Sequence, residues 1–293
     1  MGSPLRPQPP QYESAHAVFG QGAETAADME AGFNPDNPPW GVAAAALVWV
    51  ASIVLMVFVP LVTVLPYLVY RMLGTGSPPS EYSLQTDPNV LFVSIVGTIP
   101  AHILTLVVVW AVVTGGKVRR PFWRTIGWGW GRHFGLLLSV GAAVVLLVGG
   151  GLVAYFLGGE KTPFERMLES SAAARFATAF LATATAPLVE ELVYRGVMFP
   201  AFRRALGTVW AVLIVAALFS AVHVSQYYNN AGVIAAVSML GLALTLVRAY
   251  TGRVLPCFVI HLVFNAVQVA ILIFDYFNPG KPAGDAQAGL FFY

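Results

Sequence analysis

Long uncharged runs alternate with short polar segments along most of this chain. Residues 41–70 and 88–116 contain no Asp, Glu, Lys or Arg and are rich in Ala, Val, Leu and Ile, and residues 133–159 form a third such run. A helix of about 20 apolar residues crosses the hydrocarbon core of a bilayer. Each run therefore predicts one transmembrane helix.

The second half of the chain adds four predicted spans. One begins after Arg175, and the last runs from about 254 to 274. Between them, residues 205–247 carry no Asp, Glu, Lys or Arg, and the polar stretch SQYYNN (225–230) divides them into two spans. The pattern thus predicts seven spans and no strand-forming region.

Prolines leave the number of spans open by one, because Pro60 and Pro66 lie in the first run, and Pro187 and Pro200 lie in the fourth. A break at either pair gives an eighth span. We therefore expect an all-α, polytopic integral membrane helical bundle of about 7–8 transmembrane helices. The composition agrees, with 57% hydrophobic residues, 10% charged residues and a mean hydropathy of +0.72, whereas soluble domains are about one-quarter charged.

The N-terminal segment differs from the rest of the chain. Residues 1–40 are rich in Pro, Gly, Ala and acidic residues and lack an apolar core, which predicts a disordered tail and not a signal peptide. Residues 41–293 then form one membrane-embedded domain. The net charge of +2 and the absence of a basic block argue against a nucleic-acid partner. Cys257 is the only cysteine, which excludes a disulfide framework or a cysteine metal cluster.

Basic residues gather between the second and third runs. The segment GKVRRPFWRTIGWGWGR (116–132) holds five of the sixteen Lys and Arg residues. Because Lys and Arg concentrate in cytoplasmic loops, we place this segment in the cytoplasm. Alternation brings the pairs Arg203–Arg204 and Arg248–Arg253 to the same side. We expect a multi-pass protein of the cell membrane, plasma or inner, with the lipid bilayer as its surroundings.

An ionisable side chain at membrane depth is costly unless it is paired or hydrated, so it is a candidate for function. The candidates within the predicted spans are Glu190, Glu191, Arg195, His223 and His261. Glu191 and Arg195 are four residues apart with the acid first, the favourable order for a helical ion pair. Glu190 is rotated by about 100° from Glu191 on a helix. We therefore expect Glu191 to be neutralised structurally and Glu190 to remain available for chemistry.

Two further spans carry polar groups at helical spacing. His223 lies in the fifth span; His261 and Asn265 lie four residues apart in the last span, and Gln268 extends their stripe by a turn. At about 1.5 Å of rise per residue, Glu190, His223 and His261 lie roughly 20, 24 and 12 Å from the basic ends of their helices. All three can therefore meet in one cavity inside the hydrocarbon layer.

This set of side chains suits hydrolysis of an amide with Glu190 as general base, in one of two schemes. In the first, Glu190 and His223 polarise a water molecule while His261 and Asn265 stabilise the oxyanion. In the second, Glu190, His223 and His261 hold Zn²⁺, which lowers the pKa of its bound water. The residue types fit both schemes, so a zinc cofactor stays open.

The chain lacks the motifs of other classes of intramembrane hydrolase. There is no His-Glu-x-x-His, no Gly-x-Ser-x-Gly and no pair of intramembrane Asp residues. The competing hypothesis is a non-catalytic transporter or scaffold whose buried Glu, Arg and His residues form a proton relay or an ion-pair lock. Internal repeats, which are common in transporters, are not evident between the first three spans and the last four.

Three short motifs carry a resemblance to a known family. EELVYR (190–195), FSAVH (219–223) and HLVFN (261–265) resemble, in order and approximate spacing, the motifs of the CPBP family of CAAX prenyl proteases and bacteriocin-processing enzymes, also called Abi. The similarity covers roughly residues 170–275. It implies an all-helical intramembrane endopeptidase of the CAAX prenyl protease 2 type.

The resemblance also implies roles for individual residues. Glu190 corresponds to the catalytic base, His223 to the histidine of the second motif, and His261 and Asn265 to the pair of the third motif. With the scaffolding pair, the candidate catalytic set is Glu190, Glu191, Arg195, His223, His261 and Asn265. Family members are described as glutamate-dependent and as metal-dependent, so the two schemes stay open. The implied partner is a protein or peptide substrate, either prenylated or a bacteriocin-type leader, and the sequence does not choose between them.

Overall fold

The computed structural model describes residues 34–75, 87–115 and 120–278 of the 293-residue chain. Residues 1–33, which are most of the predicted tail, lie outside the described residues. The described residues belong to a single unit, Asn34–Tyr293. They are helical, and the only strand-like pairing among them is an isolated bridge between Gly131 and Phe134.

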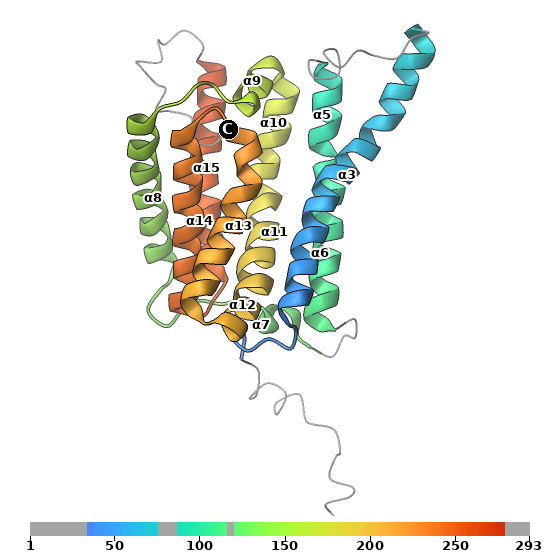
Figure 1. The fold of residues 1–293 in the computed structure, drawn as a ribbon. Coiled ribbons are helices and arrows are strands. Elements are labelled where there is room, and N and C mark those ends of the chain that lie inside the picture. Colours follow the sequence, from blue (N-terminus) through green and yellow to red (C-terminus); the bar gives the residue numbers. More distant parts are fainter. Residues whose placement is uncertain (1–33, 76–86, 116–119, 279–293) are drawn as a thin grey trace, which may run out of the picture. The chain divides into compact units, whose positions relative to one another are not determined.

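Seven helical segments in the described part of the chain are long and apolar enough to cross a membrane, which confirms the predicted polytopic all-α fold (Figure 1). The spans are α3 (Val42–Thr75), α5 (Pro88–Val96) with α6 (Thr98–Thr114), α8 (Leu136–Leu157), the composite helix from α10 (Ala172–Phe180) to α12 (Phe199–Leu206), α13 (Thr208–Tyr227), α14 (Ala231–Thr251) and α15 (Leu255–Phe277). Neither proline pair divides a span into two within these residues. Pro60 and Pro66 lie inside α3.

The surface of the bundle is apolar, as a bilayer requires. Leu137, Phe156 and Leu73 are each more than three-quarters exposed, at 86%, 78% and 79%. Helices satisfy their own backbone hydrogen bonds, which the hydrocarbon core cannot do for them. The exposed aliphatic and aromatic side chains are therefore the lipid-facing surface of a multi-pass membrane protein.

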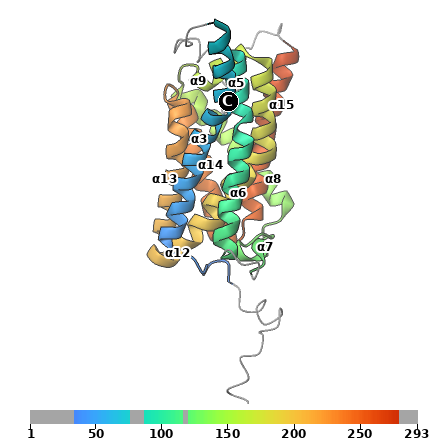
Figure 2. The same ribbon diagram turned by 90° about the vertical axis from the view of Figure 1, so that its right-hand side faces the viewer.

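Small residues let particular helices pack closely. A Cβ added at Gly232 of α14 would lie 2.7–2.8 Å from backbone atoms of Ala154 on α8. At Gly241, about two and a half turns further along α14, it would lie 2.6 Å from the ring of Phe219 on α13. Figure 2 shows α3 and α6 packed side by side on another side of the bundle. The site described below depends on the close approach at Gly241.

The composite helix contains two π-helical segments, η1 (Leu181–Thr185) and η2 (Leu192–Met198), on either side of α11 (Ala186–Glu191). Each ends two residues before a proline, Pro187 or Pro200. A proline cannot donate a backbone hydrogen bond and its ring displaces the carbonyl of the preceding turn, so the ladder changes register there. The two acidic residues of α11 therefore lie between two widened turns, a common setting for functional residues.

Two short helices mark the ends of the bundle. We call the end at which α7 (Phe122–Thr125) and α12 lie the basic end, and the end at which α9 (Pro163–Ser170) lies the far end (Figure 1). A capping box fixes the start of α9, because the Glu165 carboxylate accepts from the Thr162 N–H at 2.6 Å and the Thr162 hydroxyl accepts from the Glu165 N–H at 3.1 Å. Burial raises the pKa of the Glu165 carboxyl, against the opposing effect of its hydrogen bonds from Thr162.

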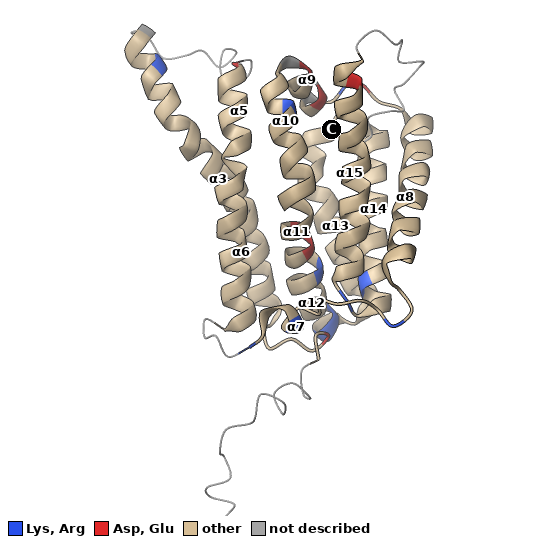
Figure 3. Cartoon of the chain, turned by 180° about the vertical axis from the view of Figure 1, so that it is seen from behind, with Lys and Arg blue, Asp and Glu red and all other residues tan. Residues whose placement is uncertain are grey.

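Lys and Arg residues collect at the basic end, around α7 and α12 (Figure 3). The N-terminal segment 34–40 packs against them. Asp36 forms ion pairs with Arg203 and Arg248, at 2.8 and 2.7 Å, and the indole Nε1 of Trp40 donates to the carbonyl of Val197 at 2.9 Å. These residues belong to the segment expected to form the tail, yet they contact α12, α14 and η2.

Candidate active site

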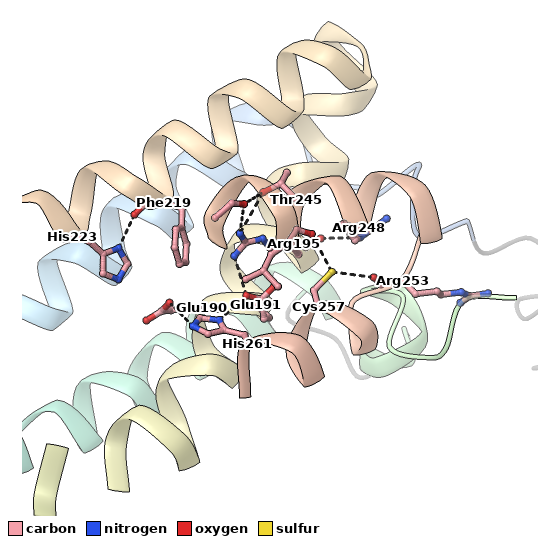
Figure 4. A network of polar contacts seen from close by, with 12 residues as sticks. Glu190, Glu191, Arg195, Phe219, His223, Thr245, Arg248, Arg253, Cys257 and His261 are labelled. Carbon is pink, nitrogen blue, oxygen red and sulfur yellow. Dashed lines mark hydrogen bonds and ion pairs between the residues drawn. The ribbon is translucent and has the colours of Figure 1, made fainter. Parts of the chain in front are cut away.

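Glu191 is fully buried and held on one oxygen by two partners (Figure 4). Arg195 Nη1 lies 2.9 Å from Glu191 Oε1, and His261 Nδ1 lies 2.9 Å from the same oxygen. The predicted i, i+4 ion pair is thus confirmed. The second oxygen, Oε2, has no hydrogen-bond partner among the described residues. Glu191 connects η2 to α15 and is not exposed to solvent.

Arg195 ties three helices together. Its Nη2 donates to the carbonyl of Gly241 at 2.8 Å and to the hydroxyl of Thr245 at 3.3 Å, both on α14. Its guanidinium carbon lies 4.7 Å from the centre of the Phe219 ring on α13, a cation–π contact. Gly241 leaves room for this ring, so the absence of a side chain there helps to place Arg195.

A second buried arginine extends the polar network to the basic end. Arg248 is fully buried; its Nε donates to the carbonyl of Arg195 at 3.1 Å and its Nη1 pairs with Asp36. Polar contacts therefore run without a break from Asp36 through Arg248 and Arg195 to Glu191 and His261. A buried arginine requires such partners, because an unpaired charge at this depth costs several kcal/mol.

Glu190 has different surroundings from its neighbour. Its side chain is 25% exposed, and its Oε2 lies 3.9 Å from His261 Nε2, beyond hydrogen-bond length. It forms no ion pair with Arg195 among the described contacts. The two adjacent carboxylates are therefore separated as the sequence predicted, one enclosed and one accessible.

The hydrogen bonds of the two histidines fix which nitrogen of each is left for chemistry. His223 Nδ1 lies 2.8 Å from the carbonyl of Phe219, which can only accept, so this nitrogen carries a proton. His261 Nδ1 likewise faces the Glu191 carboxylate, which accepts from it and from Arg195. In both rings Nε2 is the remaining nitrogen, and both rings line the cavity that contains Glu190.

Asn265 and Gln268 occupy different surroundings on α15. Asn265 lines the cavity, and its Nδ2 donates to the carbonyl of Ala182 in η1 at 2.9 Å. Gln268 is buried with 1% of its surface exposed, and its Nε2 has no hydrogen-bond partner among the described residues. Gln268 is absent from the cavity lining, so the polar stripe contributes Asn265 alone to the cavity.

Two cavities meet at Glu190. Cavity 1 has a volume of about 230 Å³ and is lined by Glu190, His223, His261 and Asn265 among others. Cavity 2, of about 460 Å³, lies between α3, α6, η2 and α13. The residues that line both are Met56, His102, Glu190, His223 and Gln226. Glu190 and His223 thus lie at the junction of the two cavities.

His102 is the residue of this junction that the sequence analysis missed. It lies on α6, is 5% exposed, and its Nδ1 is 2.8 Å from the hydroxyl of Thr185 in η1. The run 88–116 was identified by its lack of Asp, Glu, Lys and Arg, and a histidine does not interrupt such a run. The criterion applied to His223, an ionisable residue at membrane depth, would have found it.

The candidate zinc ligands do not form a metal site as they lie. Glu190, His223 and His261 are a plausible set for zinc. Among the residues that the structure describes, no three His, Cys, Asp or Glu side chains are arranged to hold a metal ion. The geometry therefore does not fit a resident zinc ion.

Comparison with known proteins gives one match. Residues 172–267 match a family model described as Rce1-like, the type II CAAX prenyl endopeptidase Rce1-like family. The resemblance found in the three motifs is thereby confirmed. All six candidate residues lie within the matched region, and His102 lies before it. A search of curated proteins and a search of solved structures each gave no match.

Proposed function

We propose that this multi-pass membrane protein is an intramembrane endopeptidase of the CAAX prenyl endopeptidase type, with Glu190 as its general base. The observation that carries the proposal is the contrast within one pair of residues. Glu191 is buried and bound to Arg195 and His261, whereas Glu190 is partly exposed at the junction of two cavities. The family match supports the same class of reaction.

The first chemical step is attack of water on the scissile carbonyl. Glu190 accepts one proton from the water while the oxygen bonds to the carbonyl carbon. His223 Nε2, held in place by the bond from its Nδ1 to Phe219, accepts the second water hydrogen as a hydrogen bond and so orients the nucleophile. A cavity shielded from bulk water strengthens both interactions.

The negative charge that develops on the carbonyl oxygen needs donors. His261 lines the cavity with Nδ1 held by the Glu191 carboxylate, and in this scheme the ring acts as an imidazolium that donates from Nε2. We assign oxyanion stabilisation to that Nε2–H and to the amide of Asn265. The intermediate collapses when the C–N bond breaks and Glu190 returns its proton to the leaving amine.

His102 is assigned a positioning role in this scheme. It lines both cavities, and its contact with Thr185 joins α6 to η1. A ring at this place can orient the substrate backbone without taking part in proton transfer. No step is assigned to zinc, and metal analysis of the purified protein with and without chelator tests the alternative scheme. The proposal leaves open a prenylated protein or a bacteriocin-type leader as substrate, and the plasma or inner membrane as location.

The test is cleavage of a quenched peptide library by the purified full chain. We expect the wild type to cleave and Glu190→Gln to lose activity by about 10²–10⁴-fold, the usual contribution of a general base. Glu169→Gln is the matched control, because Glu169 lies on α9, is exposed and pairs with Lys161.

Full cleavage by Glu190→Gln would show that the mechanism is wrong. A folded wild-type protein that cleaves no peptide would instead favour the transporter or scaffold hypothesis.

A further inference from the structure

We propose that segment 34–40 is a positioning element of the active site: Asp36 and Trp40 hold the widened turn η2, and η2 holds the buried polar chain that ends at His261. This inference rests on the proposed endopeptidase function, because positioning is measured as turnover. It adds to that function a contribution from residues that touch neither the substrate nor a reacting group. Three observations carry it: a preset turn, two hydrogen bonds to η2 and the way in which Arg248 is neutralised.

The sequence presets the shape of the segment. A turn begins at Asn34, whose carbonyl accepts from the Asn37 N–H at 2.9 Å. The side chain of Asn34 also accepts from the Asp36 N–H at 2.9 Å. Pro35, the second residue of the turn, has a fixed φ angle. The backbone at Asp36 is therefore already ordered by its neighbours, and little conformational entropy is lost when its carboxylate binds.

Two carbonyl groups of η2 accept hydrogen bonds from outside the helix. Trp40 is 5% exposed, and its indole Nε1 donates to the carbonyl of Val197 at 2.9 Å. Arg248 Nε donates to the carbonyl of Arg195 at 3.1 Å. Both acceptors lie in the π-helical segment Leu192–Met198, whose hydrogen-bond register differs from that of the α-helix on either side. Donors from outside thus help to fix the turn that carries Arg195.

Segment 34–40 also neutralises Arg248, which is fully buried on α14. Among the described residues, the guanidinium donates to Asp36 Oδ1 at 2.7 Å and to the Pro35 carbonyl at 3.4 Å, in addition to the Arg195 carbonyl. Asp36 is the one carboxylate that pairs with it in the described part of the chain. Because an unpaired buried charge is costly, loss of Asp36 would draw Arg248 toward other acceptors and away from the Arg195 carbonyl.

The position of Arg195 in turn sets that of His261, because both bond to one oxygen. Arg195 Nη1 and His261 Nδ1 each lie 2.9 Å from Glu191 Oε1 (Figure 4). A shift of the guanidinium therefore moves the carboxylate, and the carboxylate turns the ring. His261 Nε2 is the nitrogen assigned to the oxyanion, which forms only in the transition state. We expect a displaced ring to lower kcat and to leave KM nearly unchanged.

A second arginine of the cluster separates positioning from simple stabilisation. Arg203 on α12 pairs with the other carboxylate oxygen of Asp36, at 2.8 Å. Its side chain makes no hydrogen bond to η2 among the described residues. Arg203→Met thus removes an ion pair from the same carboxylate, while the bonds from Arg248 and Trp40 to η2 remain.

The first measurement is steady-state cleavage by the purified full chain and three variants. Asp36→Asn removes the charge that pairs with Arg248, and Trp40→Phe removes the indole donor while keeping an aromatic ring. We expect each to lower kcat about fivefold and to change KM by less than about twofold, the size of effect typical of contacts remote from a site. Arg203→Met is the matched control and should keep the kcat of the wild type.

The second measurement is hydrogen exchange followed by mass spectrometry, which does not require catalysis. We expect peptides that cover residues 192–198 to exchange faster in Asp36→Asn and Trp40→Phe than in the wild type and Arg203→Met. If Asp36→Asn fails to fold, Trp40→Phe carries both measurements, since it removes one uncharged donor.

A wild-type kcat in Asp36→Asn, or in Trp40→Phe where that variant replaces it, would overturn the inference and leave the endopeptidase function intact. An equal loss of kcat in Arg203→Met would also overturn it, because the cluster would then act only by stabilising the basic end. If the wild type cleaves no peptide while exchange at 192–198 follows the expected pattern, the endopeptidase function is contradicted and the positioning of η2 by segment 34–40 is supported.

Discussion

The two halves of the helix Ala172–Leu206 have opposite character. In the far half, from α10 through η1, the sequence AAARFATAFLATATA is dominated by Ala and Thr, and cavity 1 lies against it. In the basic half, LVYRGVMF (192–199) consists mostly of large side chains, and all of its residues are buried. Small residues leave the space in which a substrate can bind, while large ones and a paired arginine hold the helix in place. Glu190 and Glu191 lie at the boundary, which explains their different surroundings.

The largest effect on cleavage should come from replacing Glu190, the accessible one of the two adjacent carboxylates. Glu190→Gln should abolish cleavage, by about 10²–10⁴-fold, with an unchanged midpoint of thermal unfolding, because Glu190 makes no buried ion pair with Arg195. Parallel peptide-cleavage and unfolding measurements in detergent check this. A large drop in the unfolding midpoint would mean that Glu190 belongs to the scaffold.

The next largest effect is expected in the basic half of the helix. Arg195→Met leaves Glu191 buried without its cation and removes the bonds to Gly241 and Thr245, so it should destabilise the fold by about 3–5 kcal/mol. Denaturant unfolding in mixed micelles measures the change. Arg124→Met, at an exposed position of α7, is the control. Equal stability of the two variants would show that the buried pair does not stabilise the basic half of the helix.

A smaller effect on activity is expected from filling cavity 1, which lies against the far half of the helix. Ala186→Leu adds a side chain into cavity 1 and should raise KM about tenfold with little loss of stability, because the space is occupied without breaking a bond. Ala184→Leu in η1 is a matched control, since Ala184 is exposed and absent from both cavity linings. Similar kinetics for both variants would argue that substrate does not use cavity 1.

The smallest effect concerns the N-terminal segment. Asp36→Asn removes the partner of Arg203 and Arg248, and should lower the free energy of unfolding by about 1–2 kcal/mol, since Asp36 is itself partly exposed. Thermal unfolding measures the loss. Asp275→Asn, near the far end of α15, is a comparable change in charge away from this cluster. A loss of stability no greater than that of the control would show that segment 34–40 does not stabilise the basic half of the helix.

Much of the fold could be predicted from local patterns, because a long run of apolar residues is enough to indicate a transmembrane helix. The seven spans agree with the structure to within a few residues at most ends. The pair Glu191–Arg195 was also predictable, since its geometry depends only on helical spacing. These features need no knowledge of what packs against the helix.

The parts that were missed depend on contacts between distant segments or on departures from the α-helix. His261 reaches Glu191 across 70 residues of sequence, and Asp36 reaches Arg248 across 212. No spacing rule gives either contact. His102 was missed for another reason, because a neutral histidine does not interrupt an uncharged run. The site roles of these residues remain predictions.

The π-helical segment η1 has a consequence for how this architecture can vary in length. A π turn closes its hydrogen bonds over five residues where an α turn uses four, so removing one residue from Leu181–Thr185 would restore regular α geometry. Because the widened turn takes up the extra residue within itself, α10 would keep nearly the same rotation about the helix axis relative to Glu190. Thr178 would still face cavity 1, and the buried half beyond Glu191 would keep its register. The widened turn η1 is therefore a place where this architecture can lose one residue without redirecting the substrate-facing half of the helix.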